Sequence, residues 1–94
     1  MMDWKPYDPT WLVEWVRANR PDVAWVADAL ARCTRAADGG RAYLYFEDPD
    51  DANQPGAGWQ MAENVTLEHP TEGTLVLDVL LDRRIGGIEF LRRL

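Results

Sequence analysis

The sequence is poor in the residues that most often build catalytic and metal sites. Its 94 residues include one cysteine, Cys33, and one histidine, His69. A lone cysteine cannot form an internal disulfide, and a lone histidine excludes a metal site built from several histidines. Neither of the two glycine pairs lies in a G-x-G-x-x-G motif between a strand and a helix. A phosphate-binding loop of that type is therefore excluded as well.

The sequence also lacks long apolar runs. None approaches the roughly 18 residues that a membrane-spanning helix requires. The N-terminal stretch MMDWKPYDP has neither a basic region nor an apolar core, so we expect no signal peptide. With one cysteine and no export signal, we expect a cytoplasmic protein that does not bind membranes.

Positive charge is scarce, and it forms no basic stripe. The net charge is −6, and residues 1–37 and 71–94 each balance their acidic and basic side chains. Residues 38–70 carry seven acidic side chains against Arg41 alone, so the whole excess lies in the middle third. Such a surface repels nucleic-acid phosphates and attracts cations or basic proteins. We therefore expect no direct binding of nucleic acid.

Two helices are predicted in the first third of the chain. Asp8 is a favoured N-cap and Pro9 suits the first helical position, so we expect a helix over residues 9–19. Pro21 then begins a second predicted helix over residues 22–36. In both segments, apolar residues recur every three or four positions, as on one buried face of a helix.

The rest of the chain predicts strands, at residues 42–46, 59–61 and 64–68, and then a closing β-hairpin. With Asp82-Arg83 as a two-residue tip, the hairpin has one apolar face and one mixed face. The apolar face pairs Leu75 with Phe90, Leu77 with Ile88 and Val79 with Gly86. The mixed face pairs Val76 with Glu89, Asp78 with Gly87 and Leu80 with Ile85.

These elements predict an α+β fold in which one or two N-terminal helices pack on a small antiparallel sheet. The sheet is expected to have about four strands in a meander. We expect a single domain over residues 1–94, with a helical part at 1–37 and a sheet part at 38–94.

Two stretches of the chain carry a family resemblance. They are Val76-Leu77-Asp78 with Asp82-Arg83-Arg84-Ile85-Gly86-Gly87-Ile88-Glu89-Phe90-Leu91, and the first strand from Asp38 to Phe46. They resemble the bacterial domain-of-unknown-function family numbered 2283. The resemblance implies a small antiparallel sheet without assigned catalytic residues, and an antitoxin or immunity role. Arg83 stands where the family usually has glycine, and the helices and the acidic loop are additions to the family's pattern.

The acidic loop EDPDDANQPGAG is the first candidate site. At about twelve residues it is long for a hairpin connection, and loops of this length are often functional. We predict that Glu47, Asp48, Asp50 and Asp51 form a docking surface for a basic protein. Two alternatives stay open, namely a solvated turn and a cation site built from the oxygens of residues 47–53.

Tryptophan is the second candidate feature, because the chain has five. Trp59 follows the loop, and Trp25 lies off the apolar stripe of the second predicted helix. Partly exposed tryptophans are favoured at interfaces, so we predict that Trp59 and Trp25 are apolar anchors for the partner. A pocket for a small aromatic ligand is an alternative.

We expect structural roles for the remaining reactive residues. His69 precedes a proline in a turn, and Cys33 lies on an apolar helical stripe, where it acts as a small hydrophobe. Asp78 and Glu89 are expected on one face of the sheet. In the structural interpretation they keep this face in contact with water, and in the functional alternative they are the carboxylate pair of a hydrolase.

The sequence therefore predicts a non-catalytic binding protein of the immunity or antitoxin type, without a cofactor or metal. Its expected partner is a basic cytoplasmic toxin, for example a nuclease. The alternatives are a small enzyme or a metal- or ligand-binding protein that uses the acidic loop, and an assembly module that forms a homodimer.

Overall fold

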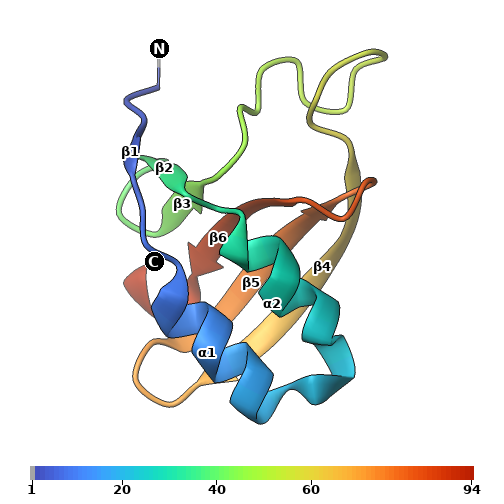
Figure 1. Cartoon of the computed structure of the whole chain (residues 1–94). Helices are drawn as coiled ribbons and strands as arrows, with labels where there is room; N and C mark the ends of the chain where they lie inside the picture. Colours follow the sequence, from blue (N-terminus) through green and yellow to red (C-terminus); the bar gives the residue numbers. More distant parts are fainter. Residues whose placement is uncertain (1) are drawn as a thin grey trace.

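The computed structural model describes residues 2–94, which form two α-helices against one face of a six-stranded antiparallel sheet (Figure 1). The helices are α1 (Thr10–Asn19) and α2 (Ala24–Ala31), with short 3-10 turns η1 (Pro21–Val23) and η2 (Leu91–Arg93). The strands are β1 (Lys5–Pro6), β2 (Arg35–Asp38), β3 (Tyr43–Tyr45), β4 (Met61–His69), β5 (Gly73–Leu80) and β6 (Ile85–Phe90). No helix among these residues is both long and apolar enough to cross a membrane.

The strand order is β1-β2-β3-β6-β5-β4. Only β4, β5 and β6 form a meander, because β3 pairs with β6 and the chain then crosses to the far edge of the sheet. The predicted α+β class is confirmed, but the expectation of about four strands is wrong. The two strands without a counterpart in the prediction are β1 and β2, which pair with each other next to β3.

The second helix is shorter than predicted. Residues 21–23 form a 3-10 turn, α2 ends at Ala31, and residues 35–38 are the strand β2 rather than a helical end. The helical part is thus confined to residues 10–31, not 1–37. The first helix lies close to its prediction, and the Asp8 carboxylate accepts a hydrogen bond from the Thr10 backbone N–H at 3.0 Å.

The register of the closing hairpin agrees with the prediction at four pairs and differs near the tip. Leu75 pairs with Phe90, Val76 with Glu89, Leu77 with Ile88 and Asp78 with Gly87. After Asp78 the register shifts, so that Val79 pairs with Ile85 instead of Gly86. The connection spans residues 81–84 rather than two, and Arg83 takes a left-handed conformation with φ 65°.

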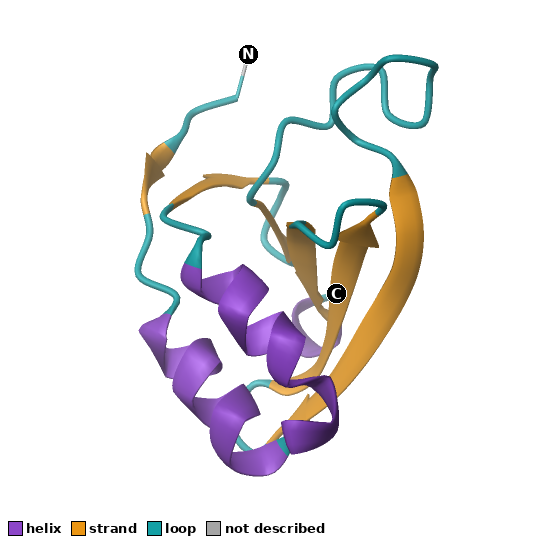
Figure 2. Cartoon of the chain, turned by 45° about the vertical axis from the view of Figure 1, so that its right-hand side comes forward, coloured by secondary structure: helices purple, strands orange, loops and turns teal. Residues whose placement is uncertain are grey.

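The two faces of the sheet have different environments, because both α-helices lie on one side of it (Figure 2). Leu75, Leu77 and Ile88 are 0% exposed and belong to a core that also contains Val16 of α1 and Leu30 of α2. Neither α1 nor α2 covers the opposite face. The connection between β3 and β4 extends beyond one end of the sheet (Figure 1), and its last part brings Trp59 against Gly86 of β6. The core therefore occupies one side, and the rest of the second face is open.

Candidate functional site

Trp59 fixes the acidic loop to the sheet instead of standing at the surface. Its side chain is 6% exposed, and its ring lies against Gly86, where an added Cβ would be 2.7 Å from the Trp59 Cη2 atom. The Tyr45 ring packs edge-on against it at 6.0 Å between centroids. The prediction that Trp59 is a partly exposed anchor is wrong, because Gly86 has no side chain and leaves room for the indole.

Hydrogen bonds hold the loop in one conformation. The Asn53 N–H donates to the Trp59 carbonyl at 2.8 Å, and the Asn53 side-chain oxygen accepts from the Met61 N–H at 2.9 Å. Arg84, next to the hairpin tip, reaches the loop twice. Its guanidinium pairs with Glu47 at 2.9 Å and donates to the Gly58 carbonyl at 2.8 Å. The loop is thus an ordered surface element, which lowers the entropy cost of binding a partner.

The four acidic residues of the loop divide into one paired and three outward-facing carboxylates. Glu47 is the member that pairs with Arg84. Asp48, Asp50 and Asp51 are exposed, and the Asp48 carboxylate accepts from the Asp50 N–H at 2.9 Å. Asp51 has φ 54°, a left-handed conformation that aspartate and asparagine tolerate better than most residues. Among residues 2–94, no cluster of three or more His, Cys, Asp or Glu side chains could hold a metal ion, so the alternative cation site lacks converging ligands.

Trp25 lies on α2 and is only partly exposed. Its ring packs against the core, and the Arg83 guanidinium of the hairpin tip covers it at 4.4 Å from the ring centroid. A guanidinium over an indole face is a favourable cation–π contact. Trp25 therefore already has a partner within the chain, and the structure groups it with the hairpin tip.

The two tyrosines of β3 were not predicted as site residues from the sequence. Tyr43 and Tyr45 project from the open face, and their ring centroids are 4.6 Å apart. The Tyr43 hydroxyl donates a hydrogen bond to the Asp78 carboxylate, which also accepts from the Asn64 side chain at 2.6 Å. Burial, followed by this hydrogen bond, raises the pKa of Tyr43. The alternation Tyr43-Leu44-Tyr45 was the available signal, because it places both rings on one face.

The open face is acidic over the strands β3 to β6. The strand register places Glu68, Asp78 and Glu89 on it beside the tyrosines. Within the paired residues of these strands, no Lys or Arg shares this face. Asp78 and Glu89 do lie on one face as predicted. Asp78 is hydrogen-bonded to Tyr43 and Asn64, which gives it a structural role in addition to its charge.

Cys33 and His69 have structural environments. Cys33 is 8% exposed, and burial raises the pKa of its thiol to about 12, so the reactive thiolate is absent near neutral pH. The His69 Nδ1 atom accepts from the backbone N–H groups of Thr71 at 3.3 Å and Glu72 at 3.1 Å. This histidine thereby stabilises the turn between β4 and β5.

The sheet has two edge strands, β1 and β4, of which β4 is the longer, with nine residues. Glu63 and Glu68 lie on β4 and are exposed. Charged side chains on an edge strand disfavour pairing with a second copy. This edge therefore offers little support for a homodimer formed by strand pairing.

Comparisons with known proteins place the chain in no family. No protein-family model matches it, and it has no significant match among curated proteins or solved structures. The resemblance of the closing hairpin to the family numbered 2283 stays a prediction, and the fold and the surfaces described above carry the functional argument.

Proposed function

We propose that this chain is a non-catalytic protein-binding module that covers a basic site on a cytoplasmic partner, as an immunity protein or antitoxin does. The observation that carries the proposal is the composition of the open sheet face. It combines the rings of Tyr43 and Tyr45 with three carboxylates, and no basic side chain lies among its paired residues in strands β3 to β6. Aromatic rings give apolar contact area, and charges of one sign select an oppositely charged partner.

The acidic loop extends this surface. Asp48, Asp50 and Asp51 face solvent on an ordered segment that Trp59 and Arg84 attach to the same face. A fixed array of carboxylates steers a basic partner before contact, which raises the association rate at low salt. A toxin that binds nucleic-acid phosphates, such as a nuclease, presents the complementary positive surface.

The test first identifies the partner and then measures the rate constants of its association with the chain. The tagged chain is used to purify bound proteins from the native host, and each purified protein is then measured against the wild type and charge variants. The open-face variant carries Glu68→Gln and Glu89→Gln, and the loop variant carries Asp48→Asn, Asp50→Asn and Asp51→Asn. Glu14→Gln, on the exposed side of α1, is the matched control.

We expect both variants to slow association roughly 3- to 10-fold at about 50 mM salt and to flatten its dependence on salt, because steering is screened at high ionic strength. The Glu14→Gln control is expected to bind like the wild type. The proposal is contradicted if all variants associate at the wild-type rate, or if Glu14→Gln slows association as much as the other variants do. It is also contradicted if no basic protein partner is found.

A further inference from the structure

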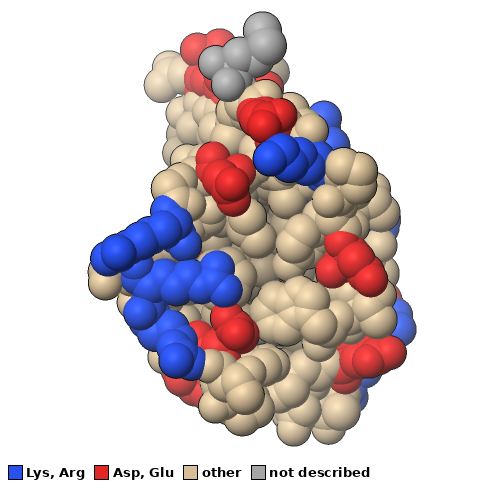
Figure 3. All heavy atoms as spheres, turned by 90° about the vertical axis from the view of Figure 1, so that its left-hand side faces the viewer, with Lys and Arg blue, Asp and Glu red and all other residues tan. Residues whose placement is uncertain are grey.

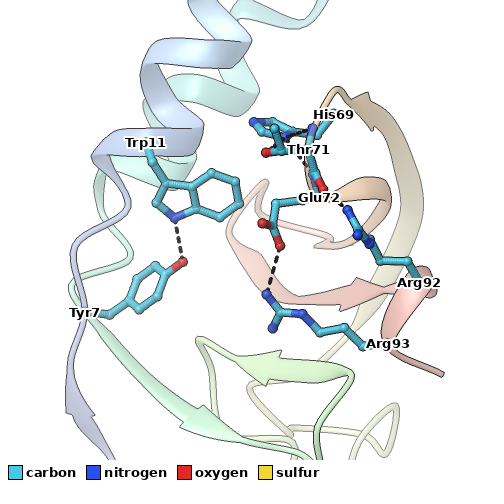
Figure 4. Close-up of polar contacts among 7 residues, drawn as sticks. All are labelled: Tyr7, Trp11, His69, Thr71, Glu72, Arg92 and Arg93. Carbon is cyan, nitrogen blue, oxygen red and sulfur yellow. Dashed lines mark hydrogen bonds and ion pairs between the residues drawn. The ribbon is translucent and has the colours of Figure 1, made fainter.

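A cleft lies on the side of the sheet opposite to the proposed protein-binding face, beside the first turn of α1. This cleft has a volume of about 530 Å³ and lies between the segment before α1, the first turn of α1, the β4–β5 turn and η2 (Figure 4). Leu44 and Phe90 form part of its lining, and their side chains belong to the core face. The cleft is therefore distinct from the acidic face proposed above to bind protein. Its volume is within the range of small-molecule sites.

One wall of the cleft is a fixed aromatic surface. Trp11 is 36% exposed, and its indole N–H donates to the Tyr7 hydroxyl at 3.0 Å. The His69 ring meets the indole edge-on at 5.5 Å between centroids, which holds the ring from the other side. An exposed indole with two fixed neighbours is a preformed platform for a planar ligand, because it loses little freedom on binding.

The opposite wall is polar. The Arg93 guanidinium lies 3.9 Å over the Phe90 ring and pairs with the Glu72 carboxylate at 2.9 Å. Figure 4 shows this ion pair facing Trp11 and Tyr7 across the cleft. The Tyr7 hydroxyl accepts the indole N–H, so its own hydrogen remains available as a donor. Burial is the main cause of the raised pKa of Tyr7, which keeps this hydroxyl protonated.

Positive charge collects beside the cleft. Arg93 also lines a shallower neighbouring hollow, together with Arg41 and Arg92. Glu72 offsets one of these three charges, so the side chains around the two hollows carry an excess of two positive charges. Figure 3 shows a group of Lys and Arg side chains at the left of this view, and others at its upper right and right edge. A local positive excess in a chain of net charge −6 favours an anion here.

We propose that this cleft binds a small planar aromatic molecule with one anionic group. The ring of the ligand packs against Trp11, and its anionic group accepts hydrogen bonds from Arg93 and the Tyr7 hydroxyl. Arg41, which forms no ion pair within residues 2–94, adds attraction from the neighbouring hollow. This site is independent of the proposed protein-binding face.

Nuclear magnetic resonance titration with four probes tests the proposal. The probes are indole-3-acetate, phenyl phosphate, neutral indole-3-acetamide and cationic tryptamine. We expect one or both anions to bind at about 0.1 to 1 mM, with shifts confined to the Trp11 indole N–H and to the segments that line the cleft, namely residue 7, residue 44, residues 69–72 and residues 90–93. The first two probes distinguish a carboxylate from a phosphate ligand. The amide and the amine are expected to bind about tenfold more weakly, because hydrogen bonds to charged groups are the stronger ones.

Single substitutions measure how much each wall of the cleft contributes to binding. Trp11→Ala and Arg93→Gln are each expected to weaken binding of the anion about tenfold, and Arg41→Gln about threefold. Arg17→Gln, an exposed arginine on α1, is the control and is expected to have no effect. Arg41→Gln is informative even if Arg93→Gln disturbs the turn that Glu72 belongs to. The proposal is wrong if tryptamine binds as tightly as the anions, if the shifts lie elsewhere, if Arg41→Gln and Trp11→Ala bind normally, or if no probe binds.

Discussion

The two faces of the sheet differ in what they contribute to the protein. The face under the helices holds Leu75, Leu77, Ile88 and Phe90, none of which is more than 2% exposed. The open face presents tyrosine rings and carboxylates, and no polar or charged residue among residues 2–94 is fully buried. The free energy of folding thus comes mainly from the covered face, because apolar burial is the dominant favourable term. The composition of the open face is correspondingly free to serve recognition.

Two glycines of β6 lie where the acidic loop meets the open face. Gly86 and Gly87 lie at the start of β6, and the indole of Trp59 and the ring of Tyr43 rest on them. Aromatic rings that cover strand glycines protect the backbone of a sheet and add contact area. The open face therefore has structural contacts of its own, among them the Trp59 contact that attaches the acidic loop.

Substitution of neighbouring residues on β5 tests the difference between the faces. Leu77→Ala removes a fully buried side chain and is expected to lower the free energy of unfolding by about 2 to 5 kcal/mol. Val76→Ala, one position earlier and facing the open side, is expected to cost about 1 kcal/mol or less. Urea denaturation of both variants measures the difference. Similar losses for the two would mean that the open face is also part of the core.

Substitution of two glycines tests the Trp59 contact. Gly86→Ala would place a Cβ atom 2.7 Å from the Trp59 ring, so we expect a loss of about 1 to 3 kcal/mol as the ring and loop are displaced. Gly58→Ala is the control, since an added Cβ there meets nothing within 4 Å. Urea denaturation reports stability, and the solvent exchange of the Trp59 indole N–H, followed by nuclear magnetic resonance, reports the exposure of this one tryptophan among five. A harmless Gly86→Ala would show that the loop is not held by this packing.

The sequence predicted what depends on local pattern. The alternation in the closing hairpin identified both strands and four cross-strand pairs, because period two decides which side chains share a face. The segment 35–38 was predicted only in part as helix, because the second helix was expected to extend through residue 36. Its strand conformation comes from pairing with β1 and β3, which local sequence does not reveal.

The candidate site was predicted less well than the fold. The acidic loop was identified correctly as an exposed charged segment, but Trp59 was expected at the surface because a Gly-rich stretch precedes it. Its burial depends on Gly86, which lies far away in the sequence. The register shift after Asp78 also falls at Gly86, the residue against which Trp59 packs. The cleft at Trp11 is formed by four separate segments, and its residues share no sequence motif.

The pH dependence of stability at alkaline pH tests the burial of Cys33 on the covered face. Burial raises the pKa of this thiol from its ordinary value of 9.0 to about 12 in the folded protein. Between these values the unfolded chain loses the proton while the folded protein retains it. The free energy of unfolding therefore falls as the pH rises, by up to about 1.4 kcal/mol per pH unit, and is unaffected by this group below pH 9. Wild type and Cys33→Ala, compared by urea denaturation at several pH values, isolate this effect, and parallel pH profiles would exclude it.

Charge removal in the loop is expected to have the smallest effect on folding. Asp48→Asn keeps an oxygen that accepts the Asp50 N–H, and asparagine suits the left-handed conformation of residue 51. Glu47 and its ion pair with Arg84 are left intact. The triple variant with Asn at 48, 50 and 51 lowers the net charge from −6 to −3, and we expect its stability to stay within about 0.5 kcal/mol of the wild type. Thermal or urea denaturation checks this. A larger loss would assign these carboxylates to the folded structure, whereas an unchanged stability together with a slower association rate would assign them to recognition.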